Sequence, residues 1–298
     1  MRYADAEAFR AALEQRLRTR AQQRGVELSR LRKQVVFDRL LARLLALAPE
    51  RYVLKGGYAL DLRLGDRARA TQDIDLVVFE SIDVVIDDLS TVATDPNADD
   101  YFVLAANRTA ALEGLEAATA VRFLVQSQLA GRRFEQFHLD VGFGDAPSAS
   151  PELVVGQDLL AFADVPPLTI PTLPIEQHVA EKLHAYTRTY ADGRQSTRVK
   201  DLVDLVLILR SMSPSAQALM EAIGATFADR DTQPRPDHLP TPPSGWTAQY
   251  VRLAGQVGID TDLKAGWRAS SAFLNPVLGG EVAPEATWSP DDQRWVVR

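Results

Sequence analysis

The chain contains no cysteine and no apolar run long enough to cross a membrane. Without cysteine it can form no disulfide, no thiolate metal site and no thiol nucleophile, so any metal must be bound by oxygen or imidazole. A membrane helix needs about 20 consecutive apolar residues, and the N-terminal stretch MRYADAEAFR has no apolar signal core. We therefore expect a cytoplasmic protein that does not contact a membrane.

An overall excess of positive charge is also missing, because the net charge is -7. Proteins that coat nucleic acid usually have a global basic excess, so this balance argues against such a protein. Residues 15–33 are an exception, with seven basic side chains and one acidic side chain, Glu27. This segment is either a face that contacts phosphate or a solvated helix face, and the lack of interleaved aromatic residues leaves both interpretations open.

The hydrophobic content of 46% over 298 residues is enough for a large core. Helical spacing of Leu and Val and short β-branched runs together predict an α/β (α+β) fold with a mixed sheet. We expect helices at 5–24, 27–48 and 83–89 and strands at 52–55, 74–79, 102–105, 121–129 and 137–143. We expect later helices at 175–190, 198–211, 215–228, 246–257 and 262–274, with a turn at 192–193.

Prolines between 147 and 174 indicate a linker between domains. The expected organisation is N-terminal helices at 1–50, a core at 51–150 and a mainly helical C-terminal domain at 151–298.

Two carboxylates lie two residues apart in the run Thr71-Gln-Asp-Ile-Asp-Leu-Val-Val. Successive side chains of a strand point to opposite faces, so Asp73 and Asp75 share one face, with Cα atoms about 6 to 7 Å apart. Such a pair can bind Mg²⁺, or Mn²⁺, and phosphoryl transfer needs a cation of this kind. Asp140, alone among apolar neighbours in the strand 137–143, is expected to complete the metal site, or else to be an ordinary polar group at a strand end.

A glycine pair, Gly56-Gly57, comes after a predicted strand and before a short helix. Bare backbone N–H groups at a helix N-terminus can approach phosphate oxygens, which makes this turn a candidate for binding triphosphate. Lys55 stands beside the pair. It is either a phosphate contact or a solvated charge at the end of a strand.

Five motifs occur in a recognisable order: Lys55-Gly-Gly-Tyr-Ala-Leu, Arg69-Ala-Thr-Gln-Asp-Ile-Asp, Asp140, Glu181-Lys-Leu, and Lys200-Asp-Leu-Val-Asp. Together they resemble the AbiEii/MenT nucleotidyltransferase toxins over about residues 30–210. The resemblance implies a DNA polymerase β-like nucleotidyltransferase core, a helical C-terminal part and an active site in the cleft between them. It also implies transfer of nucleotides from a nucleoside triphosphate to an acceptor such as the tRNA 3′ end, which blocks translation. A cognate antitoxin of a type IV-like toxin–antitoxin system would restrain this activity.

Carried over to this chain, the resemblance makes Asp73 and Asp75 the metal ligands and Lys182 the residue that holds the triphosphate. It also makes Asp204 an acidic residue required for activity. Asp204 lies in an apolar run where an unpaired carboxylate is costly, so we expect it to contact a cation, either Lys182 or a metal. The alternatives are a surface lysine at Lys182 and, for Asp204 and Asp201, a network of salt bridges within one helix.

Two further residues receive roles from their positions. Tyr58 follows the glycine pair where many nucleotidyltransferases have a small hydroxyl residue, and it either stacks on the nucleotide base or packs inside. Thr71 stands two residues before Asp73. Our hypothesis is that phosphorylation of Thr71 would place a dianion beside the metal site and stop the reaction.

The sequence thus predicts a Mg²⁺-dependent nucleotidyltransferase with RNA as the expected acceptor. One alternative is transfer to a hydroxyl of a protein or a small molecule, which the acidic net charge favours slightly. Another is an inactive relative that binds a partner protein, against which stand the intact Asp-Ile-Asp pair and Lys182.

Overall fold

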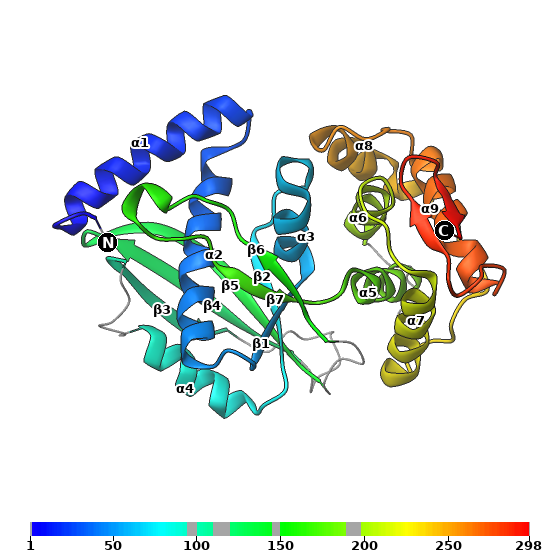
Figure 1. Ribbon diagram of the computed structural model, residues 1–298, viewed down its shortest axis with the longest axis horizontal. Helices are drawn as coiled ribbons and strands as arrows, with labels where there is room; N and C mark the ends of the chain where they lie inside the picture. The colour runs from blue at the N-terminus through cyan, green and yellow to red at the C-terminus, as the bar shows by residue number, and fades with distance from the viewer. Residues whose placement is uncertain (1, 94–99, 110–119, 145–149, 189–197, 298) are drawn as a thin grey trace. The chain divides into compact units, whose positions relative to one another are not determined.

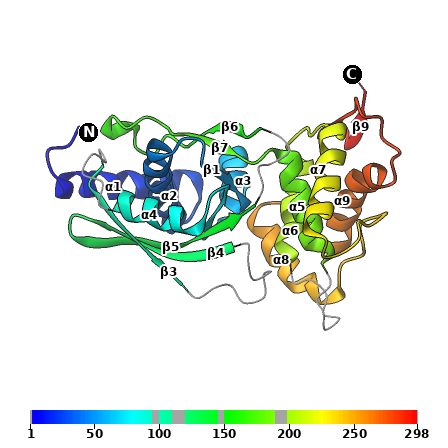
Figure 2. The ribbon, with the colours of Figure 1, turned by 90° about the horizontal axis from the view of Figure 1, so that it is seen from below.

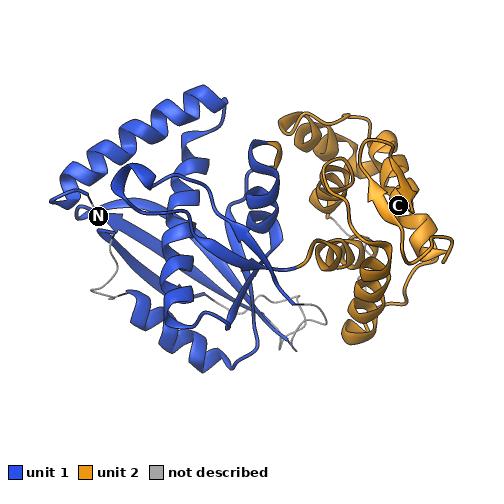
Figure 3. Cartoon of the chain, in the orientation of Figure 1, with its two compact units in different colours: residues 1–66, 70–173 blue, residues 67–69, 174–298 orange. Residues whose placement is uncertain are grey.

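The computed structural model describes residues 2–93, 100–109, 120–144, 150–188 and 198–297 (Figure 1). The chain divides into two compact units (Figure 3). The first unit contains Met1–Asp66 and Ala70–Leu173, and the second contains Arg67–Arg69 and Pro174–Arg298.

The first unit, as far as it is described, contains one mixed sheet of seven strands in the order β3-β4-β5-β2-β1-β7-β6. The strands are β1 (Tyr52–Lys55), β2 (Asp73–Val78), β3 (Phe102–Arg108), β4 (Ala120–Leu129), β5 (Arg132–Phe143), β6 (Glu152–Val155) and β7 (Thr169–Thr172). β2 lies at the centre, antiparallel to β1 and parallel to β5. The central strand therefore has a hydrogen-bonded neighbour on both sides.

Three helices lie on one side of this sheet (Figure 2). They are α1 (Ala6–Arg24), α2 (Leu28–Leu47) and α4 (Ile82–Ala93), and the shorter α3 (Gly56–Leu64) follows β1 directly. Leu31 and Leu40 of α2 and Ile74 and Leu76 of β2 are almost fully buried in one shared core. Burying one such side chain contributes about 1.5 to 3 kcal/mol, so these contacts hold the helices on the sheet.

The basic segment at 15–33 makes contacts within the first unit. Arg30 is buried and donates to Asp61, while Lys33 donates to the carbonyl oxygen of Gln136 over 2.8 Å. The other contacts are Arg16 over the ring of Phe162, Arg20 to the carbonyl oxygen of Asp158, Arg24 to Gln157, and Arg32 to Glu14. Six of the seven basic side chains thus have a partner within the first unit, while Arg16 and Arg18 are exposed, and contact of this segment with phosphate stays a prediction.

The division between the units lies after Leu173, later than the expected boundary after residue 150. β6 and β7 extend the sheet of the first unit, and β7 pairs with β1. The prolines that indicated a linker are compatible with these elements, since Pro171 lies within β7 and Pro174 is the N-cap residue of α5. Proline fits at the start of a helix and at a strand position that needs no N–H donor. A run of prolines therefore does not by itself mark a domain boundary.

The second unit is mainly helical. Its elements are α5 (Ile175–Thr187), α6 (Val199–Leu209), α7 (Ala216–Arg230), α8 (Thr247–Gln256), α9 (Leu263–Leu278) and a hairpin of β8 (Thr287–Ser289) and β9 (Arg294–Val296). Every residue of α6 except Lys200 is buried, because α5, α8 and α9 all pack against this helix. In the hairpin, Trp288 packs on Phe273 of α9 with ring centroids 4.9 Å apart.

The predicted order of a mixed α/β sheet followed by helices is confirmed. The C-terminal hairpin was not predicted, and the turn expected at 192–193 lies outside the described residues. Among the described helices, none is long and apolar enough to cross a membrane.

Candidate active site

Asp73 and Asp75 lie on the same face of the central strand β2, as predicted. The strand alternates strictly, with both aspartates partly exposed and Ile74, Leu76 and Val78 fully buried in the core. The apolar residues thus fix the register, since a shift by one residue would expose all three and bury the carboxylates. The side chain of Asp73 is 36% exposed, so a ligand from solvent can reach it.

The neighbouring strands place further polar residues beside this pair. Asp75 stands opposite Lys55 of β1 on one side and Asp140 of β5 on the other. Asp73 stands opposite His138, and the two side chains approach to 3.3 Å between Nδ1 and Oδ1. Paired residues of adjacent strands point to the same face, so the predicted acidic residues do share one surface of the sheet.

Gly56 is required where it stands, for two reasons. Its φ is +67°, in the left-handed region that favours glycine, and an added Cβ would overlap with the carboxylate of Asp75. Gly56 and Gly57 open α3 directly after β1, so the N-terminus of this helix lies against Asp75. A helix N-terminus carries partial positive charge and backbone N–H groups, which favours anions such as phosphate near the carboxylate pair.

Asp140 is engaged by a residue that sequence reasoning missed, Arg122 of β4. The guanidinium makes two parallel hydrogen bonds to Asp140, from Nε to Oδ1 and from Nη2 to Oδ2, each 2.6 Å long. The hydrogen bond with Asp140, and after it the charges of Asp140, Asp73 and Asp75, raise the pKa of Arg122 although partial burial opposes this. A lone arginine in a predicted strand gave no signal, because its partner is specified by strand pairing.

The carboxylate pair fits a hard divalent cation. Mg²⁺ is usually bound by one or two protein carboxylates, with water and substrate phosphates as the remaining ligands, and Asp73 and Asp75 supply such a set. In the described part of the chain no group of three His, Asp or Glu side chains is arranged to hold a metal ion. Asp140 is an ion-pair partner in this structure, and its role as a third metal ligand stays a prediction.

Tyr58 does not face a nucleotide, which corrects the proposed stacking on the base. Its side chain is 1% exposed, and its hydroxyl donates to Oδ1 of Asp38 over 3.1 Å. The ring contacts Phe37 edge to face at 4.9 Å, and burial raises the pKa of Tyr58 well above its usual value. On α3 the residue points into the core beneath α2, so the second of the two interpretations is right.

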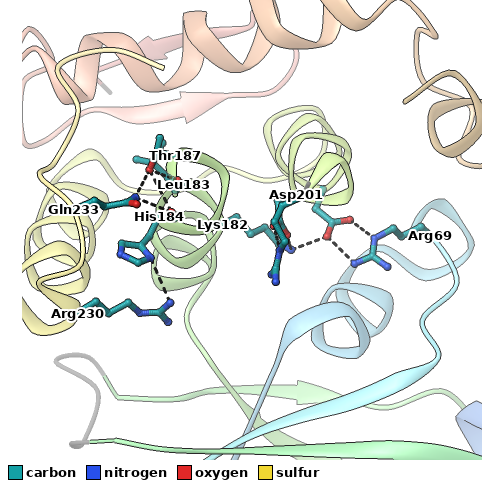
Figure 4. A network of polar contacts seen from close by, with 10 residues as sticks. Arg69, Lys182, Leu183, His184, Thr187, Asp201, Arg230 and Gln233 are labelled. Atoms are coloured by element: carbon teal, nitrogen blue, oxygen red, sulfur yellow. Dashed lines mark hydrogen bonds and ion pairs between the residues drawn. The ribbon is translucent and has the colours of Figure 1, made fainter. Parts of the chain in front are cut away.

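Lys182 and Asp204 form a buried ion-pair cluster with Arg69 in the second unit (Figure 4). Oδ2 of Asp204 accepts from Nζ of Lys182 over 2.6 Å, and Oδ1 accepts from Nε of Arg69 over 2.8 Å. Burial would raise the pKa of Asp204, but Lys182 and Arg69 outweigh it and lower the pKa to about 2. The predicted cation partner is therefore confirmed, and Lys182 is not a surface lysine.

Asp201 belongs to the same cluster. It accepts a hydrogen bond from Nε of Arg198, three residues earlier, over 2.7 Å, and its other oxygen is 3.4 Å from Nζ of Lys182. The salt bridge within one helix is thus right for Asp201, whereas the partners of Asp204 come from outside its helix. Arg69 was missed as one of these partners because 135 residues separate it from Asp204.

Thr71 is 8% exposed, and its hydroxyl donates to the carbonyl oxygen of Asp73 over 3.1 Å. Phosphorylation of Thr71 stays a prediction, and it would require this hydrogen bond to open. Retention of full activity in Thr71→Glu would contradict the proposed inhibition.

His184 is structural. Its Nε2 lies 2.9 Å from the hydroxyl oxygen of Thr232, and its ring contacts Phe227. Its Nδ1 lies 3.5 Å from Nη1 of Arg230 (Figure 4). Burial, together with the charges of Arg230 and Arg188, lowers the pKa of His184 to about 4. The imidazole is therefore neutral at physiological pH.

Comparison with known proteins gives one family match. The family described as "Nucleotidyl transferase AbiEii toxin, Type IV TA system" matches residues 39–276. Among proteins of curated function, none matches the chain.

Solved structures extend the comparison over nearly the whole chain. MenT4, a nucleotidyltransferase toxin from Mycobacterium tuberculosis H37Rv, aligns with 96% of this chain and 99% of its own, at 19% identity and a TM-score of 0.52. A protein from H. pylori aligns with 84% of this chain and 94% of its own, at 18% identity and a TM-score of 0.46. JHP933 from Helicobacter pylori aligns with 83% of this chain and 93% of its own, at 18% identity and a TM-score of 0.42. The similarity to MenT4 supports the nucleotidyltransferase fold.

Proposed function

Because this chain belongs to the AbiEii family of nucleotidyltransferase toxins, we propose that it transfers a nucleoside monophosphate to an acceptor hydroxyl. The donor is a nucleoside triphosphate, and pyrophosphate is released. The expected acceptor is the 3′ end of tRNA, whose modification would block translation. A cognate antitoxin, as in other type IV systems, would restrain the activity.

The observation that carries this proposal is the partly exposed pair of Asp73 and Asp75 beside Gly56. Two carboxylates on one strand face can hold a divalent cation. Because Gly56 has no Cβ, the carboxylate of Asp75 can occupy the space beside it. Phosphoryl transfer asks a protein mainly for positioning and charge stabilisation, which this arrangement can supply.

The candidate site residues then have distinct roles in the proposed reaction. Asp73 and Asp75 would hold Mg²⁺ or Mn²⁺, which when bound stabilises the charge that develops on the phosphates. Backbone N–H groups at Gly56 and Gly57, with the ammonium group of Lys55, would bind phosphate oxygens. Lys182 is proposed to hold the triphosphate, and a Lys182→Met variant is then expected to raise KM for the nucleotide.

The acceptor hydroxyl would attack the α-phosphate in line with the bond to the leaving pyrophosphate. The new bond joins the acceptor oxygen to the α-phosphorus, the bond from that phosphorus to the β-phosphate bridging oxygen breaks, and the acceptor proton passes to water or to a nearby carboxylate. Because the nucleophile and the leaving group are both held by the site, the protein contributes through alignment.

The test is incubation of wild-type and Asp75→Asn protein with Mg²⁺, total RNA and each of the four α-labelled nucleoside triphosphates. Label in tRNA with wild type alone supports the proposal and identifies the base. Label in protein or in small molecules instead would assign the alternative acceptor that the net charge of -7 favours. No transfer in any fraction would leave the chain as an inactive relative that binds a partner.

A further inference from the structure

The bidentate pair of Arg122 and Asp140 lies next to the proposed metal ligands and is unexplained by the proposed reaction. Asp140 is directly opposite Asp75 in the parallel pairing of β2 and β5, and Arg122 is directly opposite Asp140 in the antiparallel pairing of β4 and β5. Asp75, Asp140 and Arg122 thus follow one another in a row across three strands. Side chains in such a row share one face of the sheet.

Arg122 and a divalent cation would both be attracted to the same carboxylates. The guanidinium binds both oxygens of Asp140, which leaves that side chain committed to the ion pair. The charges of Asp73 and Asp75 also act on Arg122, so it is close enough to repel a cation bound by them. Its side chain is 30% exposed, so the pair is accessible to solvent and can rearrange.

We infer that Arg122 is a positioning residue that competes with the metal ion for Asp140. In the nucleotide-free protein Arg122 keeps Asp140 out of the metal site, and Asp73 and Asp75 bind the cation weakly. Triphosphate, which is anionic, offsets the charge of Arg122 and supplies further oxygen ligands, so tight metal binding requires nucleotide. This inference rests on the proposed function, since it assumes that β2 binds a metal.

The test is Mn²⁺ binding to nucleotide-free protein, measured from the electron paramagnetic resonance signal of free Mn²⁺. Arg122→Gln is expected to bind Mn²⁺ about five- to tenfold more tightly than wild type, because a nearby positive charge is removed and a carboxylate is released. Arg122→Lys keeps the charge but loses the two parallel hydrogen bonds to Asp140, so its gain in affinity should be smaller than that of Arg122→Gln. Asp140→Asn added to Arg122→Gln should remove most of the gain.

Arg51→Gln is the matched control. Arg51 pairs with Asp88 in the same unit, has a side chain 28% exposed, and stands next to Tyr52, at the opposite end of β1 from Lys55 and Asp75. Its loss should leave Mn²⁺ affinity unchanged. Arg122→Met, which keeps the apolar stem of the side chain, repeats the test if Arg122→Gln does not fold.

An equal or weaker Mn²⁺ affinity in the neutral Arg122 variants would overturn the inference. Asp75→Asn separates this failure from failure of the proposed function. If Asp75→Asn abolishes Mn²⁺ binding and the Arg122 variants bind no more tightly, the inference alone is wrong. If Asp75→Asn binds Mn²⁺ as well as wild type, the metal is not on β2, and both proposals fail.

Discussion

The pair of Asp73 and Asp75 and the cluster around Asp204 use the same acidic residue type, but they differ in exposure to solvent. Asp73 and Asp75 are partly exposed on a sheet face of the first unit, whereas Asp204 is 1% exposed in the second unit between a lysine and an arginine. A buried carboxylate must be compensated by fixed partners, while an exposed one keeps access to ligands from solvent. The difference indicates that Asp73 and Asp75 are open to a ligand from solvent, whereas the pairs of Asp204 with Lys182 and Arg69 also stabilise the second unit, besides the role proposed for Lys182.

The largest effect is expected from Asp75→Asn, and it should fall on activity. Loss of one ligand of the metal site should lower nucleotidyl transfer on the order of a thousandfold. Because Asp75 is partly exposed, the free energy of unfolding should change by less than about 0.5 kcal/mol. Label transfer and urea unfolding of the same preparation measure both quantities, and retention of a tenth of the activity would contradict the assignment.

Asp204→Asn should show the reverse pattern. Removal of one partner from a buried ion pair costs about 3 to 5 kcal/mol, because Lys182 and Arg69 would keep their charges without the carboxylate. Urea unfolding should report this loss, with Asp75→Asn as the comparison. A loss below about 1 kcal/mol, together with abolished activity, would break the contrast and give Asp204 a part in the chemistry.

Gly56→Ala tests how closely the first cluster is packed. The variant combines an unfavourable positive φ with overlap of the new Cβ and the carboxylate of Asp75, so both stability and activity should fall. Gly25→Ala is the matched control, since its φ of +66° is nearly the same and nothing lies within 4 Å of its Cβ. The control should lose about 1 to 2 kcal/mol of stability and keep its activity. Equal activity in the two variants would mean that displacement of the Asp75 carboxylate does not affect nucleotidyl transfer.

The effects of pH on stability should have opposite signs in the two units. Burial raises the pKa of Asp38 in the first unit to about 6, and burial with nearby arginines lowers the pKa of His184 in the second unit to about 4. Between about pH 4 and 6 Asp38 is protonated in the native state but ionised in the unfolded state. The stability that protonated Asp38 contributes is therefore lost as pH rises through that window.

At His184 the unfolded state binds the extra proton. The contribution of neutral His184 to the free energy of unfolding is therefore lost as pH falls from about 6.5 towards 4. Thermal unfolding of Asp38→Asn and His184→Gln across this range checks the two signs against wild type. If both variants shift the pH dependence in the same direction, one of the two assignments is wrong.

Local patterns were sufficient to predict the strand that carries Asp73 and Asp75, because alternation over six residues decides which side chains share a face. They also predicted that Asp204 needs a cation, since a carboxylate within an apolar helix must be compensated. Arg69 and Arg122 could not be predicted as partners, because their contacts depend on tertiary packing and on strand register. The burial of Tyr58 depends likewise on α2, whose position over α3 no local pattern specifies.

The central place of β2 has a consequence for the timing of folding. Asp73 lies beside His138, 65 residues later in the chain, and β1 finds its second neighbour in β7, later still. Pairing of strands that lie this far apart in the sequence closes large loops, and such contacts form slowly compared with local helices. A growing chain on the ribosome would therefore carry Asp73 and Asp75 for many residues before the sheet around them is complete. The sheet around Asp73 and Asp75 can therefore be complete only after β5 and β7 have been synthesised.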